Sequence, residues 1–179
     1  MTSAYFDTSV WMGPFDSQES RPNQKEIESA IRELIDMHRS GKIELVISRM
    51  VKEELNNLLN DPTRASKAKN ALMIIQELSL RKLPRTPADI GKATIGEARI
   101  GQECKFTDLP KKPSDRDIAE YLTANHVKFF VVIDDRHFID AKTQIEQRLQ
   151  PEGTRMVTPQ ELVKHLRANK LTHNPPNAV

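Results

Sequence analysis

Acidic residues follow two of the strands that the sequence predicts, at the point where each apolar run stops. Asp7 ends the short run Ala4-Tyr5-Phe6, and Asp134 with Asp135 ends the run at 129–133. In an open α/β sheet, ligands bind beyond the carboxyl ends of the strands. The two strands are therefore expected to bring these acids to one edge of the sheet.

Further acids lie near the starts of two predicted helices. Glu53 and Glu54 fall in the early turns of the helix after the second strand, and Asp115 with Asp117 falls in the first turn of a later helix. A helix that connects parallel strands runs antiparallel to them, so its N-terminus lies at their carboxyl edge. Each acid alone has a simpler explanation as a helix cap, a turn residue or a solvated surface group. Together, the acids of four segments are expected to share one edge.

Such a cluster of carboxylates predicts a bound cation. Two carboxylates about 5 Å apart repel each other by roughly 3 kcal/mol at an effective dielectric constant near 20. Oxygen ligands without nitrogen or sulfur select hard cations, which here means Mg²⁺ or Mn²⁺. An ion of this kind can activate water for attack on a phosphodiester and stabilise charge on the leaving oxygen. The predicted chemistry is metal-dependent phosphodiester hydrolysis.

The elements that position these acids follow from the hydrophobic pattern, in which strand-like and helix-like stretches alternate. The predicted strands are 3–6, 43–47, 129–133 and 155–157, and the predicted helices are 24–39, 49–59, 63–80, 115–126, 139–149 and 159–170. This alternation predicts an α/β fold with a central, mainly parallel sheet of four to five strands and helices on both faces. We expect a single domain at 1–170 and a C-terminal tail at 171–179.

The segment 81–113 has no clear periodicity and contains several proline and glycine residues. Its eight basic residues outnumber its four acidic ones, and the basic residues include Lys111 and Lys112. A long segment without secondary structure inside a compact domain is usually functional or mobile. We expect a basic insertion or flap that meets phosphate, with a solvated loop as the alternative.

The composition excludes several other classes of protein. The single cysteine, Cys104, excludes an internal disulfide and a cysteine-based zinc site, and the five histidines show no zinc-site spacing. No apolar run approaches the roughly 20 residues that span a bilayer. The formal net charge of +2 neither demands nor excludes a nucleic-acid partner. We expect a soluble, cytoplasmic protein without a membrane partner.

The residues around the acids form a recognisable series. Tyr5 to Val10 reads as an opening strand with the first acid, and Ser48 to Leu55 reads as a Ser-led helix with a Glu-Leu pair. Asp117 begins the helix of a third acid, Asp135 follows the last long strand, and 157–162 reads as a closing strand and helix. In this series the chain resembles the PIN-domain ribonuclease family, which includes VapC-like toxins of type II toxin-antitoxin systems.

The resemblance implies a PIN-like three-layer α/β/α fold and hydrolysis of single-stranded RNA that leaves a 5′-phosphate, with Mg²⁺ or Mn²⁺ as cofactor. It favours Glu54 over Glu53. It implies four residues that are both catalytic and metal-binding, namely Asp7, Glu54, Asp117 and Asp135. Polar or basic residues that could support the site or bind RNA are Ser9, Asp134, Arg136, His137, Lys111 and Lys112.

The family also suggests protein partners. Its toxins are typically inhibited by a small antitoxin whose apolar segment lies in a groove between helices, and many of them form homodimers. In this chain the corresponding groove would lie between the helices at 49–59 and 63–80. A housekeeping RNA-processing nuclease of the same family would have a similar sequence.

Two kinds of alternative were weighed against a nuclease. A haloacid-dehalogenase-type phosphatase also begins with a strand that ends in Asp, but it needs a second Asp where this chain has Ser9. A receiver domain expects its acids in a different order along the chain. The remaining alternative is a catalytically weak or inactive PIN-fold module that binds RNA or protein, because Ile133 and His137 stand where the family often has Thr and Asp.

Overall fold

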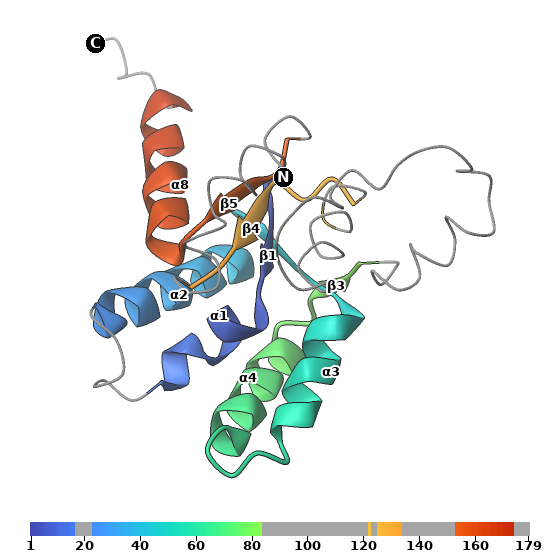
Figure 1. The fold of residues 1–179 in the computed structure, drawn as a ribbon. Helices are drawn as coiled ribbons and strands as arrows, with labels where there is room; N and C mark the ends of the chain where they lie inside the picture. Colours follow the sequence, from blue (N-terminus) through green and yellow to red (C-terminus); the bar gives the residue numbers. More distant parts are fainter. Residues whose placement is uncertain (17–22, 84–121, 123–124, 134–152, 174–179) are drawn as a thin grey trace, which may run out of the picture.

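The first strand of the chain, β1 (Ser3–Phe6), lies at the centre of a five-stranded sheet (Figure 1). The computed structural model describes residues 1–16, 23–83, 122, 125–133 and 153–173. The strand order is β3-β2-β1-β4-β5 and every neighbouring pair is parallel. The other strands are β2 (Glu44–Ile47), β3 (Arg81–Lys82), β4 (Phe129–Val131) and β5 (Arg155–Val157). The predicted α/β class and the parallel sheet are therefore confirmed.

Helices flank this sheet in two packed pairs. The α-helices in the described residues are α1 (Thr8–Met12), α2 (Gln24–Arg39), α3 (Arg49–Leu58), α4 (Ala65–Glu77) and α8 (Pro159–His173), and a short 3₁₀ helix spans Gly13–Phe15. All of these α-helices except α1 form the two pairs. α2 packs on α8, and α3 packs on α4. In Figure 1 the sheet lies between the two pairs. This arrangement is compatible with a three-layer α/β/α fold.

The helix starts follow local hydrogen-bonding signals in the sequence. The Ser48 side chain caps α3 by accepting a hydrogen bond from the backbone N–H of Val51 at 3.3 Å. Thr158 and Glu161 form a reciprocal capping box, in which each side chain accepts a hydrogen bond from the other residue's backbone N–H. Both caps were predicted from the residue types. They matter for function because the N-termini of these helices face the carboxyl edge of the sheet.

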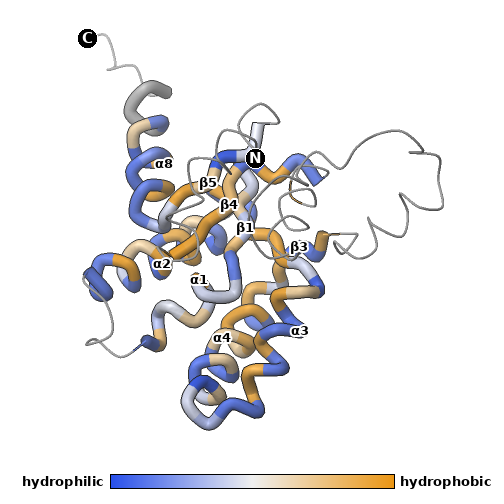
Figure 2. Tube along the Cα trace, viewed as in Figure 1, coloured by the Kyte–Doolittle hydropathy of each residue, from blue (hydrophilic) through white to orange (hydrophobic). Residues whose placement is uncertain are grey.

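The core is built around the central strands, which are buried on both faces as parallel strands usually are. Figure 2 shows hydrophobic residues along β4 and β5. Along α3, hydrophobic and polar residues alternate (Figure 2). Gly13 lies where the end of α1 approaches this core most closely. A Cβ atom there would stand 2.6 Å from the Cδ1 of Ile133 and 2.9 Å from the Cδ1 of Ile31, so a larger residue would force the core to shift.

The sequence and the structure differ at several places. Arg81 and Lys82 form the edge strand β3, and the adjacent Leu83 is buried, so the first residues of the predicted 81–113 insertion belong to the sheet. The helix α8 continues to His173 and therefore includes the first residues of the predicted tail. The predicted helices at 115–126 and 139–149 fall largely or wholly outside the described residues. Among the described residues, no helix is long and apolar enough to cross a membrane.

Candidate functional site

Asp7 lies directly after β1, at the carboxyl end of the central strand. Its backbone N–H donates a 3.1 Å hydrogen bond to the carbonyl of Val131 in β4, which continues the ladder between these strands. Its carboxylate caps α1, since Oδ2 accepts hydrogen bonds from the backbone N–H of Ser9 at 3.3 Å and from the Ser9 hydroxyl at 2.8 Å. The capping role that we considered as an alternative is thus real, and it fixes the carboxylate at the predicted edge.

Glu54 is brought to the same place by Thr8. The Thr8 hydroxyl donates a hydrogen bond to Oε2 of Glu54, which is 46 residues further along the chain. Thr8 is only 7% exposed, and the contact with the half-buried Glu54 is partly buried. Because Thr8 is the neighbour of Asp7, the contact joins the acid at the end of β1 to the acid on α3. Two of the four predicted acids therefore lie in one neighbourhood.

Glu53 takes a different role. Its side chain is exposed and forms an ion pair with Arg49, one turn earlier on α3, with 2.6 Å between Nε and Oε1. Such a pair on the surface of a helix contributes little to stability and leaves Glu53 on the solvent side. Of the two glutamates considered from the sequence, only Glu54 bonds to the segment that follows β1.

A second buried contact sets the position of α3 relative to β1. The hydroxyl groups of Tyr5 and Ser48 form a hydrogen bond of 2.9 Å, and both residues are essentially buried. Ser48 is also the residue that caps α3. This contact ties the N-cap residue of the helix to the strand that directly precedes Asp7.

At this edge, the described side-chain atoms that could bind a metal ion are oxygen atoms of the two carboxylates and of the adjacent hydroxyls. This chemistry fits a hard cation such as Mg²⁺ or Mn²⁺. Within the described ranges, no group of three or more His, Cys, Asp or Glu residues stands close enough to hold a metal ion. Asp117 and Asp135 lie outside those ranges, as do the predicted supporting residues Asp134, Arg136, His137, Lys111 and Lys112.

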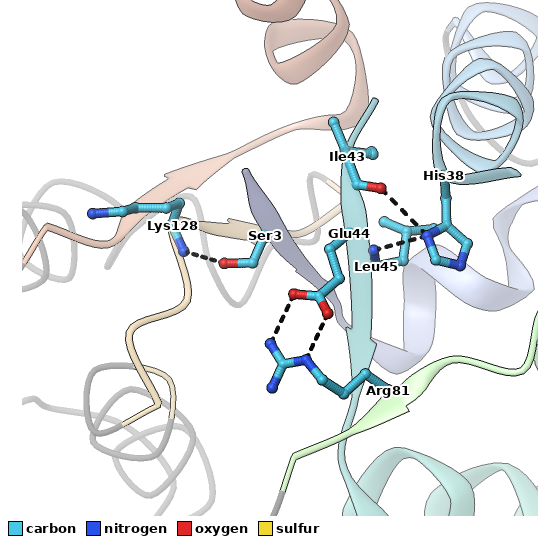
Figure 3. Close-up of polar contacts among 7 residues, drawn as sticks. All are labelled: Ser3, His38, Ile43, Glu44, Leu45, Arg81 and Lys128. Carbon is cyan, nitrogen blue, oxygen red and sulfur yellow. Dashed lines mark hydrogen bonds and ion pairs between the residues drawn. The ribbon is translucent and has the colours of Figure 1, made fainter. Parts of the chain in front are cut away.

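The amino end of the sheet is also rich in polar contacts, but these serve the backbone and one ion pair (Figure 3). The carboxylate of Glu44 accepts two hydrogen bonds from the guanidinium of Arg81, at 2.6 and 2.8 Å. This guanidinium holds the pKa of Glu44 below its ordinary value, although burial opposes the shift. Arg81, which the sequence placed in a basic flap, is therefore engaged in an ion pair between β2 and β3.

A surface pocket of about 460 Å³ lies between α2 and α8, away from the two acids. Its lining combines lysines such as Lys25 and Lys164 with acids such as Glu26, and includes an ion pair of 2.7 Å between Arg167 and Glu33. With charges of both signs, the lining favours no single class of ligand.

Thr8 is the residue that the sequence interpretation missed. Its position next to Asp7 was the only available signal, and Ser9 was considered for a supporting role instead. The hydroxyl of Thr8 acts on a residue of α3, so its role depends on how that helix packs against α1. Ser9 was expected to support the site or bind RNA, and its hydroxyl bonds to the carboxylate of Asp7.

Comparison of the chain with protein-family models, with curated protein sequences and with solved structures found no significant match. The residues at the carboxyl edge of the sheet therefore carry the functional proposal.

Proposed function

We propose that the protein is a PIN-like, metal-dependent endoribonuclease whose site is built on Asp7 and Glu54. The observation that carries the proposal is the hydrogen bond from Thr8 to Glu54, because it joins α3, which carries Glu54, to the residue that directly follows Asp7. An edge where several segments contribute carboxylates is the kind of site that a divalent cation requires. The parallel strand order and the position of Asp7 beyond the central strand further support a PIN-like arrangement.

We assign a task in this reaction to the four predicted acids and to Ser9. Asp7 and Glu54 would hold Mg²⁺ or Mn²⁺, and we propose that Asp117 and Asp135 complete the site. A cation held by these acids would act as a Lewis acid, which would activate water and offset negative charge on the leaving oxygen. The Ser9 hydroxyl orients the carboxylate of Asp7 at 2.8 Å. The substrate class is single-stranded RNA, and the product carries a 5′-phosphate.

Within this class we favour a toxin component over a housekeeping nuclease. Among the described residues, Leu59 at the end of α3 is 41% exposed and Met73 on α4 is 60% exposed. These exposed apolar side chains on the α3–α4 pair support the proposed docking of an apolar antitoxin segment there. Growth arrest on expression, relieved by Asp7→Asn, would support the toxin role, as would a short open reading frame just upstream. Normal growth on expression of the active enzyme would favour the housekeeping role.

A cleavage assay tests the proposed activity directly. Labelled single-stranded RNAs are incubated with the full chain and Mn²⁺, with and without a chelator, in parallel with Asp7→Asn. Asparagine can still accept the cap hydrogen bond from Ser9, so the variant should keep the fold while losing the charge that holds the cation. We expect cleavage to depend on Mn²⁺ and to fall by about 100-fold or more in the variant, since even outer-shell changes at metal sites cost 10-fold to 100-fold.

The opposite result has a clear meaning. If the wild-type chain cuts a range of RNAs no faster than Asp7→Asn, the enzyme proposal fails. Binding of the same RNAs without cleavage would then favour the inactive PIN-fold module, which recognises the RNA backbone but does not hydrolyse it.

A further inference from the structure

Thr8 and Ser9 are consecutive residues whose hydroxyls donate to two different carboxylates. Ser9 donates to Asp7, two residues earlier in the chain, and Thr8 donates to Glu54 on another helix. We infer that Thr8 is the positioning residue that holds Glu54 in the orientation needed for metal binding. This inference rests on the proposed function, because it concerns the same site.

The local structure explains how a threonine can do this. Thr8 is the first residue of α1, whose N-terminus is capped by Asp7, and its backbone therefore follows β1 without a flexible linker. The residue is 7% exposed, so water competes little for its hydroxyl. α1 also packs against α3, the helix that carries Glu54. The position of Thr8 is therefore set by β1, which precedes it, and by the packing of α1 against α3.

A hydrogen bond to the carboxylate of Glu54 narrows the set of rotamers that this side chain can adopt. A glutamate side chain has three rotatable bonds, and confining it costs conformational entropy that metal binding must overcome. A hydroxyl that already confines the carboxylate removes part of this cost before the cation arrives. Hydrogen-bonding partners behind metal ligands typically change metal affinity by 10-fold to 100-fold when they are lost.

Thr8→Val is the informative substitution because valine has nearly the same shape and lacks the hydroxyl. Thr8→Ser keeps the hydroxyl and removes only the methyl group. Thr154→Val is the matched control: Thr154 is 1% exposed, and its hydroxyl donates a 2.7 Å hydrogen bond to the carbonyl of Val127 at the amino end of the sheet. The control thus loses an equally buried threonine hydroxyl, far along the strands from Asp7.

The test measures Mn²⁺ affinity for the full chain by the electron paramagnetic resonance signal of unbound Mn²⁺, with thermal unfolding in chelator as a check on folding. We expect Thr8→Val to raise the dissociation constant for Mn²⁺ about 10-fold, with Thr8→Ser close to wild type. Thr154→Val should unfold at a lower temperature than wild type and bind Mn²⁺ normally.

The two proposals fail in distinguishable ways. If wild type binds no Mn²⁺, or binds it as well after Asp7→Asn, the proposed metal site itself is wrong. If wild type binds Mn²⁺ in an Asp7-dependent manner and Thr8→Val binds it equally well, only the role of Thr8 is wrong. Equal weakening of Mn²⁺ binding by Thr8→Val and Thr154→Val would also overturn the inference, because the effect would then reflect a general loss of structure.

Discussion

The two ends of the parallel sheet use the same kinds of side chain for different purposes. At the amino end, the Ser3 hydroxyl accepts a hydrogen bond from the backbone N–H of Lys128 at 3.2 Å, and Thr154 donates to the carbonyl of Val127. At the carboxyl end, the hydroxyls of Thr8 and Ser9 donate to carboxylates. The hydroxyls of Ser3 and Thr154 complete backbone hydrogen bonding at the amino end, whereas those of Thr8 and Ser9 bond to acids at the carboxyl end.

The glutamates at the two ends differ in the same way. Glu44 at the start of β2 is neutralised by the guanidinium of Arg81, whereas Glu54 on α3 receives a hydrogen bond from the neutral hydroxyl of Thr8. A guanidinium offsets the charge of its partner carboxylate, but a hydroxyl orients a carboxylate without offsetting its charge. The ion pair at the amino end contributes to stability, and under the proposed function the acids at the carboxyl end would bind a cation.

The largest expected effect comes from Glu54→Gln. The amide oxygen can still accept the hydrogen bond from Thr8, so the fold should be retained, but the charge that attracts the cation is lost. We expect RNA cleavage in Mn²⁺ to fall by about 100-fold or more, because loss of a metal ligand should exceed the effect of losing its outer-shell partner. The matched control is Glu44→Gln, which makes the same chemical change at the amino end. If the Glu54→Gln variant cleaved RNA as fast as wild type, the proposed difference in function between the two ends of the sheet would be wrong.

A smaller effect, on stability, is expected from Tyr5→Phe. The variant keeps the buried ring next to Phe130, with 6.0 Å between ring centroids, and loses only the hydroxyl that bonds to Ser48. We expect the free energy of unfolding in urea to fall by about 1 kcal/mol, the usual net value of one buried hydrogen bond. Cleavage should change little, since Ser48 would still cap α3. A large loss of cleavage with unchanged stability would mean that the Tyr5 hydroxyl belongs with the residues that orient the acids.

The smallest expected effect is that of Glu44→Gln on stability. At pH 7 we expect a loss of about 0.5 to 1 kcal/mol in the free energy of unfolding, because the ion pair with Arg81 is partly exposed. The pKa of Glu44 is lowered in the folded protein, so the ionised carboxylate stabilises the fold above its ordinary value of 4.5. This stabilisation is lost as the pH falls below that value towards the lower pKa of the folded state.

The stability difference between wild type and Glu44→Gln should therefore shrink as the pH falls below 4.5, the ordinary pKa of the carboxyl. Urea unfolding at several pH values measures it. A difference that stayed constant down to pH 3 would show that the charge of Glu44 is not what stabilises the junction of β2 and β3.

Much of the fold was predictable because its signals are local. The apolar run before Asp7, the cap at Ser48 and the capping box at Thr158 each identify an element boundary within a few residues. The strand β3 was missed because it consists of two exposed, charged residues, Arg81 and Lys82, which show no hydrophobic alternation. Their strand conformation depends on backbone pairing with β2, which the residue types alone do not indicate.

The candidate site was predictable only in outline. The rule that ligands gather at the carboxyl edge identified Asp7 and the Glu53–Glu54 pair. The choice between the two glutamates depends on the rotation of α3, in which Glu53 pairs with Arg49 and Glu54 lies next to Thr8. The resemblance favoured Glu54, but the contact between Thr8 and Glu54 joins residues 46 positions apart, so neither spacing nor composition contains it.

The central position of β1 has a consequence for when the site can form. β1 is made first, but the hydroxyl of Ser3 accepts a hydrogen bond from the backbone N–H of Lys128, 125 residues later, and the N–H of Asp7 bonds to the carbonyl of Val131. Native contacts between distant segments form slowly, because the intervening loop must close before the contact is gained. A nascent chain that lacks β4 therefore leaves Asp7 without its strand partner. The proposed site around Asp7 can therefore be completed only after the chain has been made as far as Val131.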